Sequence, residues 1–350
     1  MVGRKRPGLQ RPSAKRALRS GAGPRPNCSR LCISRSARSC PVPHFDHIPV
    51  MVAEVLAALR PKPDGQYVDG TVGWGGHAAA ILAASSPSGW LFGCDRDGAA
   101  IRAARARLKD YEDRCELRQG NFADLAEWVG PGSCDGVLLD LGVSSPQLDE
   151  AARGFSFQQA GPLDMRMDTR QPLTAADLVN AASEKELVKI LWELGEEKGA
   201  RRLAAAIVKE RVRRPLETTA QLADLIERLA PRRGQRAHPA TRVFRALRMA
   251  VNDELGSLRR GLVAALAILK PAGRLAVITF HSAEDRLVKE FGRNHERAYT
   301  YAGAVDVPEL RQPCAPQVKW VKRKAIQPDA AEVASNPRSR SAQLRVMEKF

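Results

Sequence analysis

The sequence contains no apolar run long enough to cross a membrane. A spanning helix needs about 20 consecutive apolar residues, whereas the run Leu262 to Leu269 is stopped by Lys270 and Pro271. The first 45 residues also lack the continuous apolar core of a secretory signal. These absences predict a soluble protein with no membrane partner. Its 350 residues are enough to bury a full core in one large or two modest domains.

The cysteines lack the paired spacings that bind metal ions. Three fall near the N-terminus and four are scattered over the remainder: Cys28, Cys32, Cys40, Cys94, Cys115, Cys134 and Cys314. We therefore predict no metal site, and reduced thiols in an intracellular compartment.

Acidic residues are absent from residues 1–45, which carry eleven of the lysines and arginines. This segment holds +11 of the net charge of +17, and its Arg-, Ser- and Pro-rich composition predicts a disordered basic extension. It is interpreted as an RNA-binding arm, an organellar import peptide, or the product of a start codon placed too far upstream. We favour the last interpretation, because the pattern typical of a folded domain begins abruptly at His47.

Among the features that are present, a glycine-rich turn follows a short apolar run at Tyr67 to Asp69. Gly73, Gly75 and Gly76 fall within four residues, and an alanine-rich stretch from His77 to Ala84 follows them. This order predicts a strand, a tight turn and a helix start, where backbone N–H groups point towards a ligand. The turn also fits the dinucleotide-binding pattern G-x-G-x-x-G/A.

A second apolar run, Trp90 to Cys94, ends in Asp95, which lies 22 residues after Gly73. A carboxylate at this distance, at the end of the second strand, typically holds a ribose diol, so the sequence predicts an adenosine site in a doubly wound sheet. Asp69 suits a cationic amine better than a pyrophosphate. The residues therefore favour S-adenosylmethionine over NAD, and an NAD-dependent oxidoreductase is kept as an alternative.

Two further strands extend the predicted sheet. Cys115 to Gln119 leads to Phe122, whose ring is expected either to stack on adenine or to fill the core. Cys134 to Leu141 is nearly continuous in apolar residues, as buried parallel strands are, and contains Asp140 near its end. Ligands of open α/β sheets bind outside the carboxyl ends of the strands. The aspartates that end the first, second and fourth strands are thus predicted to converge on one cleft.

The alternation of strands and helices stops near residue 150. Capping boxes begin at Ser183 and Thr218, each before apolar residues at helical spacing. Strand character returns at Arg274 to Phe280, and the segments Val318 to Ile326 and Ala342 to Met347 are candidates for the closing strands. The pattern predicts an α/β fold with an all-helical subdomain inserted at residues 150–236.

Several unusual strings resemble, in the same order, the bacterial small-subunit ribosomal RNA cytosine-N4 methyltransferases, the MraW family. They are Asp69–His77, Leu139–Asp149, Arg153–Phe157, Gly161–Asp168, His238–Arg242 and Phe280–Arg286. The resemblance runs from about residue 45 to the C-terminus.

The resemblance implies a class I methyltransferase domain, formed by residues 46–149 and 237–350, with S-adenosylmethionine as methyl donor. It also implies methylation of the exocyclic amine of a cytidine in the decoding region of 16S ribosomal RNA, free or in the assembling small subunit, in the bacterial cytoplasm. A homodimer stays open. Residues assigned to the cofactor by the resemblance are Gly75, Gly76, His77, Asp95, Phe122, Asp140 and Gln147, and the residue patterns above add Asp69 and Gly73.

The chemistry of an amine acceptor constrains the catalytic residues. Cytosine N4 is a poor nucleophile, so placement in line with the methyl group and an acceptor for the N4 hydrogens are needed. The loop from Asp140 to Gln147 holds no cysteine, which argues against methylation at C5, because that reaction uses a thiolate. The loop also lacks the second proline and the aromatic residue of the common [D/N/S]-P-P-[aromatic] motif. Asp140 is predicted either to accept from N4 or to serve only the cofactor.

His281 and a group of arginines complete the candidate site. His281 follows the fifth strand and is predicted to contact substrate or relay the released proton, with a structural role as the alternative. Arg242, Arg245 and Arg248 lie at helical spacing and are predicted to contact RNA phosphates. The target cytidine must leave its stack to enter a cleft. A DNA amino-methyltransferase and a basic RNA-binding scaffold with a vestigial cofactor site remain alternatives.

Overall fold

The computed structural model describes residues 48–230, 238–301 and 306–350. The predictions made for residues 1–45 lie outside these ranges. The described residues belong to one compact unit. Across the described ranges, every helix is too short or too polar to span a bilayer.

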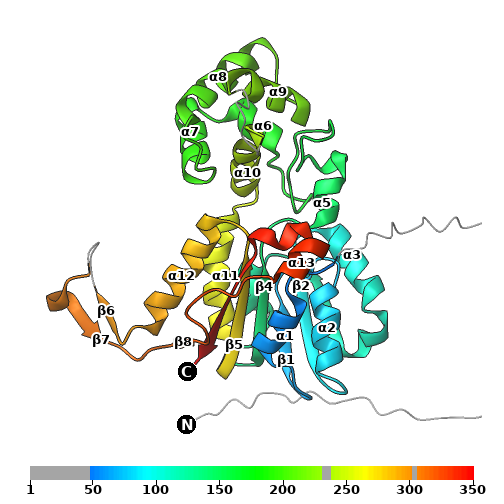
Figure 1. Ribbon diagram of the computed structural model, residues 1–350, viewed down its shortest axis with the longest axis vertical. Helices are drawn as coiled ribbons and strands as arrows, with labels where there is room; N and C mark the ends of the chain where they lie inside the picture. The colour runs from blue at the N-terminus through cyan, green and yellow to red at the C-terminus, as the bar shows by residue number, and fades with distance from the viewer. Residues whose placement is uncertain (1–47, 231–237, 302–305) are drawn as a thin grey trace, which may run out of the picture. The chain divides into compact units, whose positions relative to one another are not determined.

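A seven-stranded sheet has the order β3-β2-β1-β4-β5-β9-β8. Neighbouring strands from β3 to β5 are parallel, whereas β9 runs antiparallel to both β5 and β8 (Figure 1). The strands are β1 Gln66–Asp69, β2 Trp90–Asp95, β3 Cys115–Gln119, β4 Cys134–Asp140, β5 Leu269–Thr279, β8 Val318–Trp320 and β9 Gln343–Lys349. The sheet confirms the predicted α/β class and contains the first four predicted strands.

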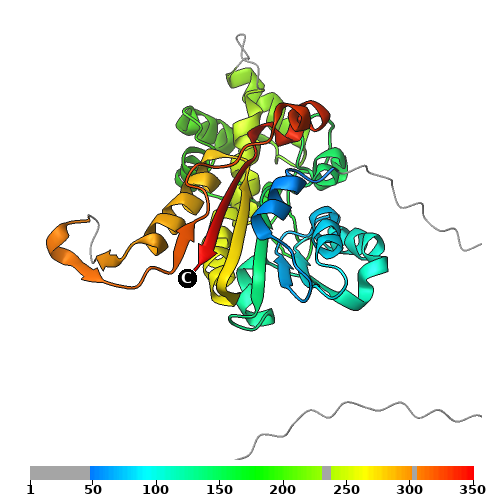
Figure 2. The same cartoon turned by 60° about the horizontal axis from the view of Figure 1, so that its bottom comes forward.

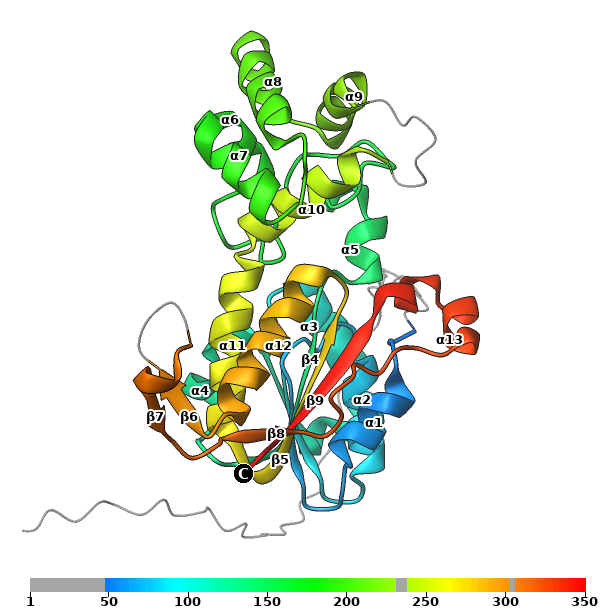
Figure 3. The same ribbon diagram turned by 60° about the vertical axis from the view of Figure 1, so that its left-hand side comes forward.

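Helices cover both faces of this sheet. On one face lie α1 (Val52–Leu59), α2 (Gly76–Ala84) and α3 (Gly98–Arg107). The other face is covered by α4 (Leu125–Trp128), α11 (Glu254–Ile268) and α12 (Ser282–Glu296) (Figure 3). Alternate residues of β4 serve the two cores: Leu138 packs with the first set and Leu139 with the second. Because both faces are buried, β4 is apolar along nearly its whole length.

A separate helical block lies between β4 and β5 in the sequence. Its helices are α5 Ser145–Asp149, α6 Ala175–Ala181, α7 Glu184–Glu193, α8 Ala200–Arg213, α9 Thr219–Leu229 and α10 Ala240–Val251. The predicted capping boxes at Ser183 and Thr218 are present. One hydrophobic core joins these helices and includes Phe244, Leu247 and Val251 of α10. We therefore propose that the helical subdomain extends to Val251, beyond the limit of 236 inferred from the sequence.

The C-terminal third differs most from the sequence prediction. The predicted strand Val318 to Ile326 is paired only as far as Trp320, and Ile326 makes an isolated bridge to Leu344. A hairpin of β6 (Tyr299–Tyr301) and β7 (Arg311–Pro313) forms a second sheet and stands apart from the main one (Figure 2). The helix α13 (Ala330–Ser335) lies beside α1, where Glu332 accepts a hydrogen bond of 2.6 Å from Met51 N.

Candidate active site

A cleft opens where the carboxyl ends of β1, β2 and β4 meet. It has about 1270 Å³ of empty volume, counting the part open to solvent. The predicted cofactor residues that line it are Gly73, Gly76, His77, Asp95, Phe122, Asp140 and Gln147. Asp69, which is fully buried, and Gly75 lie outside this lining.

The glycine turn owes its shape to backbone conformations that other residues avoid. Gly73 and Gly75 have φ angles of +50° and +77°, in the left-handed region that favours glycine. Gly75 precedes α2 as its N-cap. At Gly76, a Cβ atom would lie 2.8 Å from Pro49 Cγ, so a side chain there would collide with the segment before α1. The turn thus brings bare backbone to the edge of the cleft.

Asp95 ends β2 and is held by the turn that it faces. Its Oδ2 accepts a hydrogen bond of 2.9 Å from Gly73 N, and its Oδ1 accepts one of 2.8 Å from Asp97 N. Each oxygen keeps one further lone pair, so the carboxylate can also accept from two hydroxyl groups. Burial raises the pKa of Asp95 to about 6 despite these two backbone donors.

Asp69, His77 and Asp140 form a buried group beside the turn. Asp69 Oδ1 accepts from Thr71 N at 3.1 Å, while Asp69 Oδ2 and Asp140 Oδ1 find no hydrogen-bond partner among the described residues. His77 Nε2 lies 3.5 Å from Asp140 Oδ2. Burial raises the pKa of Asp69 to about 7. Burial opposes protonation of His77, but Asp140 and Asp69 outweigh it and raise the His77 pKa. Buried acceptors without partners are costly and suit a cationic ligand.

The side chains of Gln147 and Phe122 line the cleft but are also committed to the protein. Gln147 Oε1 accepts from Ser144 N at 3.0 Å, and its Nε2 donates to Asp97 Oδ2 at 2.9 Å. Both polar atoms of the Gln147 amide are therefore bonded to the protein, and the amide positions the loop after β4. The ring of Phe122 packs against Gly261 of α11, where a Cβ would collide with it.

Asp97 and Arg153 form a junction to which the sequence prediction assigned no function. Asp97 caps α3 through Ala99 N at 2.9 Å, and its other oxygen accepts from Arg153 Nη1 at 2.7 Å. Arg153 Nη2 also donates to the carbonyls of Arg166 and Met167, at 3.0 and 3.1 Å. Because Met167 lines the cleft, this junction holds the strings that begin at Arg153 and Gly161 against the end of β2. In the sequence, only the resemblance of these two strings to the family indicated that they have a function.

The opposite wall is fixed through Asn252, between α10 and α11. Its Oδ1 accepts from Met167 N at 2.8 Å, and its Nδ2 donates to Met165 O at 2.8 Å. The Arg96 guanidinium, next to Asp95, donates to Asn252 O and to Ser257 Oγ. Helical subdomain, cleft and sheet are thus joined by hydrogen bonds to one residue.

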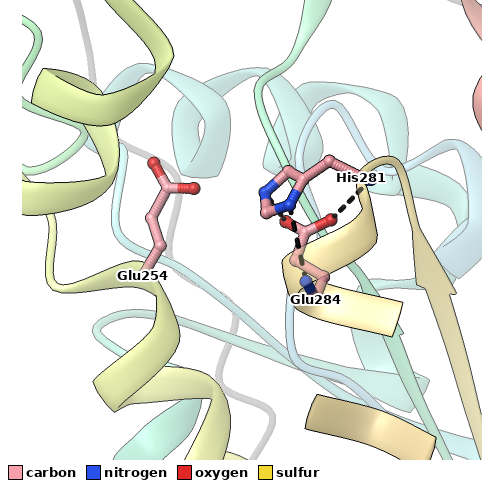
Figure 4. A group of neighbouring side chains, drawn as sticks. All are labelled: Glu254, His281 and Glu284. Atoms are coloured by element: carbon pink, nitrogen blue, oxygen red, sulfur yellow. Dashed lines mark hydrogen bonds and ion pairs between the residues drawn. The ribbon is translucent and has the colours of Figure 1, made fainter. Parts of the chain in front are cut away.

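His281 caps α12 beside two glutamates, as Figure 4 shows. Its Nδ1 accepts from Glu284 N at 3.4 Å, and its Nε2 lies 3.1 Å from Glu284 Oε1. Glu254 and Glu284 line the cleft. Ligand atoms of these three residues lie within 4.8 Å of one another, a spacing that a metal ion would allow. A metal ion on Nε2 would require the ring proton on Nδ1, whereas Nδ1 accepts a hydrogen bond from Glu284 N, so the arrangement does not suit a metal ligand.

The predicted phosphate-binding arginines differ in their surroundings. Arg242 is exposed. Arg245 is half-buried and donates to Gly195 O at 2.8 Å, and burial lowers its pKa. Arg248 is held in a two-pronged ion pair by Glu254, at 2.7 and 2.8 Å, with only 14% of its side chain exposed. Arg248 therefore faces inward, which does not fit a phosphate contact.

A C-terminal segment also borders the cleft, and the sequence prediction missed it. Asn336 and Arg338 are among the lining residues. Asn336 Nδ2 donates to Ile48 O at 3.2 Å, and Arg338 Nη2 donates to Asp149 Oδ1 at 2.8 Å. The polar run from Asn336 to Ser341, just before the closing strand, was the only local signal.

Comparison with known proteins places this geometry in a family. The sequence model of the MraW methylase family matches residues 44–350. The Ribosomal RNA small subunit methyltransferase H of Symbiobacterium thermophilum is 51% identical over 311 residues, which cover 87% of this chain and 97% of that protein. The protein of the same name from Geobacter sulfurreducens is 52% identical over 312 residues, covering 87% and 99%.

A solved rRNA methylase from Streptococcus thermophilus covers 87% of this chain and 99% of its own. Its identity of 11% and TM-score of 0.36 are too low to carry any argument about function. The family match runs from residue 44 to residue 350, and each of the two relatives aligns over 87% of the chain. The chain therefore belongs to the MraW methylase family.

Proposed function

We propose that this protein transfers the methyl group of S-adenosylmethionine to the exocyclic N4 amine of a cytidine in the decoding region of small-subunit ribosomal RNA. Membership of a methylase family and relatives named as small-subunit ribosomal RNA methyltransferases support the coarser part, methylation of this RNA. The observation that carries the proposal is the group of buried, incompletely bonded acceptors beside the glycine turn.

The residues of the cleft fit this cofactor. The carboxylate of Asp95 would hold the ribose hydroxyls, because both its oxygens retain a lone pair beyond the bonds to Gly73 and Asp97. Asp69 and Asp140 supply negative charge for a ligand that bears an amine and a sulfonium. When bound, S-adenosylmethionine supplies a methyl group already activated for attack by a nucleophile.

The proposed acceptor atom follows from the residues around the cleft. None of the described residues that line it is a cysteine, so a thiolate for attack on a pyrimidine ring is not at hand. Burial raises the pKa of Cys94 well above its ordinary value, and this thiol donates to Gly70 O at 3.3 Å, which suits a structural role. An amine nucleophile needs only placement and an acceptor for its hydrogens. Asp140 Oδ1, at the end of β4, is an acceptor that none of the described residues occupies.

Binding of RNA would extend beyond the cleft onto the helical subdomain. Arg242, exposed on α10, is the member of the predicted group that can reach a phosphate. The target cytidine would be unstacked to enter the cleft. A homodimer and a cytoplasmic site of action stay predictions.

Nucleoside mass spectrometry tests this proposal. Small-subunit RNA that lacks the modification would be incubated with the protein and a methyl donor carrying a trideuterated methyl group, then digested to nucleosides. We expect deuterium in N4-methylcytidine and in no other nucleoside. Label in 5-methylcytidine, in adenosine or in no nucleoside would contradict the proposal.

A further inference from the structure

The wall of the cleft beside the ends of β4 and β5 carries polar groups that cofactor binding does not explain. Glu254 is the first residue of α11, and both it and Glu284 line the cleft. His281 stands between them (Figure 4), with 10% of its side chain exposed. Its Nε2 is buried and lies 3.1 Å from Glu284 Oε1, but the angle does not make a hydrogen bond, and Nε2 has no other hydrogen-bond partner in the described part of the chain. A buried group left in this state points to a ligand.

Glu254 is held as a rigid carboxylate. Arg248 donates to both of its oxygens, from Nε at 2.7 Å and from Nη2 at 2.8 Å. Burial opposes the charge on Arg248, but Glu254 and Glu284 raise its pKa. A two-pronged pair fixes the plane of the carboxylate and leaves each oxygen one lone pair. Glu254 therefore presents an oriented acceptor to the cleft.

Glu284 is not available in the same way. It is 2% exposed, and its Oε2 accepts from Phe280 N at 2.9 Å and from His281 N at 3.3 Å. Burial disfavours its charge, but the His281 side chain, Phe280 N and Arg248 lower its pKa. Since Nδ1 of His281 accepts from Glu284 N, the imidazole offers its Nε2–H to the cluster. The wall thus places an acceptor, Glu254, beside a donor, His281 Nε2–H.

This pair matches one edge of cytosine. Cytosine offers two hydrogens on N4 and an acceptor at N3, whereas uracil offers an acceptor at O4 and a hydrogen on N3. We propose that Glu254 accepts from the N4 amine and that His281 Nε2–H donates to N3, so that these two residues select cytosine over uracil. Adenine has the same donor and acceptor order, so the width of the cleft must exclude purines. This inference rests on the proposed function.

The pair also completes the chemistry at N4. The amine carries two hydrogens, and Asp140 provides an acceptor for one; Glu254 provides the other. With both hydrogens held, the N4 lone pair forms a bond to the methyl carbon. The bond from that carbon to sulfur breaks, and its electron pair stays on sulfur, which becomes a neutral thioether. The positive charge passes to N4, which loses one proton to the Glu254 carboxylate and then to water.

Single-turnover methylation with three variants tests the inference. Glu254→Gln keeps the size of the side chain but puts an amide donor towards the amine. We expect a rate about 100-fold lower, as for loss of one oriented group in other active sites, with cofactor affinity within twofold of wild type. His281→Asn can still cap α12 but lacks the Nε2–H, and we expect a rate at least 10-fold lower. Asp253→Asn is the matched control.

The control is the neighbouring carboxylate. Asp253 is 61% exposed and pairs with Arg260 outside the cleft lining. Its φ angle of +44° is one that asparagine tolerates, so its rate should stay within twofold of wild type. If Glu254→Gln fails to fold, Glu254→Asp keeps the charge and withdraws the carboxylate by one methylene. The same loss of rate is expected for it.

A competition assay reads the selectivity directly. As a competitor of methylation by wild type, RNA with uridine at the target position should inhibit at least 10-fold less well than the same RNA with cytidine there. The Glu254→Gln variant should lose this preference. If wild type forms N4-methylcytidine and the Glu254 variants form it at rates within threefold of wild type, this inference alone is overturned. Loss of cofactor affinity with a normal rate at saturating cofactor would also overturn it. Absence of N4-methylcytidine with wild type would overturn both this inference and the proposed function.

Discussion

Replacing Asp69 by asparagine isolates the cost of placing a charge behind the glycine turn. Asp69 is fully buried, and only its Oδ1 has a donor, Thr71 N at 3.1 Å. Asparagine has nearly the same shape, keeps an acceptor for Thr71 N and never ionises. The substitution therefore removes the titration of the side chain while leaving its packing almost unchanged.

The magnitude follows from the pKa. Burial raises the pKa of Asp69 from 3.8 to about 7, so the folded protein binds this proton more tightly than the unfolded chain. The stability that the proton confers is complete below about pH 4 and is lost as pH rises through 7. A difference of about three pKa units, at 1.36 kcal/mol each, corresponds to about 4 kcal/mol. The Asp69→Asn variant should therefore become more stable than wild type as pH rises from 4 to 8, by up to about 4 kcal/mol in the free energy of unfolding.

Urea unfolding of both proteins without cofactor, at several pH values, measures this difference. Asp135→Asn is a control of opposite sign. Burial opposes the charge on Asp135, but hydrogen bonds from Lys270, Gln66 N and Lys62 lower its pKa to about 2. Asp135→Asn should thus be less stable than wild type at pH 7, with the deficit shrinking as pH falls below 4. A constant difference between Asp69→Asn and wild type across the pH range would refute the reasoning.

Three further substitutions test other parts of the account. Asp140→Asn should slow single-turnover methyl transfer about 100-fold even at saturating cofactor, and a normal rate at saturating cofactor with weakened cofactor binding would assign Asp140 to the cofactor alone. Arg242→Glu should weaken RNA binding and reduce the slope of log affinity against log salt by about one or more; unchanged binding would remove Arg242 from the RNA surface. Arg153→Met should lower the free energy of unfolding by about 3 kcal/mol, since it unpairs buried Asp97. Arg170→Met, which removes a pair that is 59% exposed on the arginine side, should change it by about 0.5 kcal/mol or less.

The sheet was predictable because its strands are buried on both faces. Runs such as Cys134 to Leu141 leave little choice of structure, and Cys115–Gln119 has the same bounds in sequence and structure. Helix starts that depend on neighbouring side chains could also be predicted, as at the capping box of Ser183. The aspartates at the strand ends could be placed near one another because topology alone brings them to one edge of the sheet.

Orientation around a helix axis was harder to predict. Arg242, Arg245 and Arg248 follow one another at three-residue spacing, which moves each about 60° around the axis. Arg242 and Arg248 therefore lie about 120° apart, and the latter faces Glu254. A prediction based on charge alone places all three arginines on the surface.

Long-range contacts gave no local signal at all. Glu332 and Met51 are 281 residues apart in the sequence but are hydrogen-bonded beside the cleft. Nothing in a polar run such as Asn336 to Ser341 says which part of the fold it will cover. The same limit applies to Glu254, whose place in the cleft depends on the packing of α10 and α11.

A crystal structure of the protein with S-adenosylhomocysteine tests the central claim most directly. The account predicts the ribose hydroxyls within hydrogen-bond distance of Asp95, the amino group near Asp69 and Asp140, and backbone of the glycine turn against the ligand. A ligand bound elsewhere, or one that leaves Asp95 and Asp140 without contact, would contradict it.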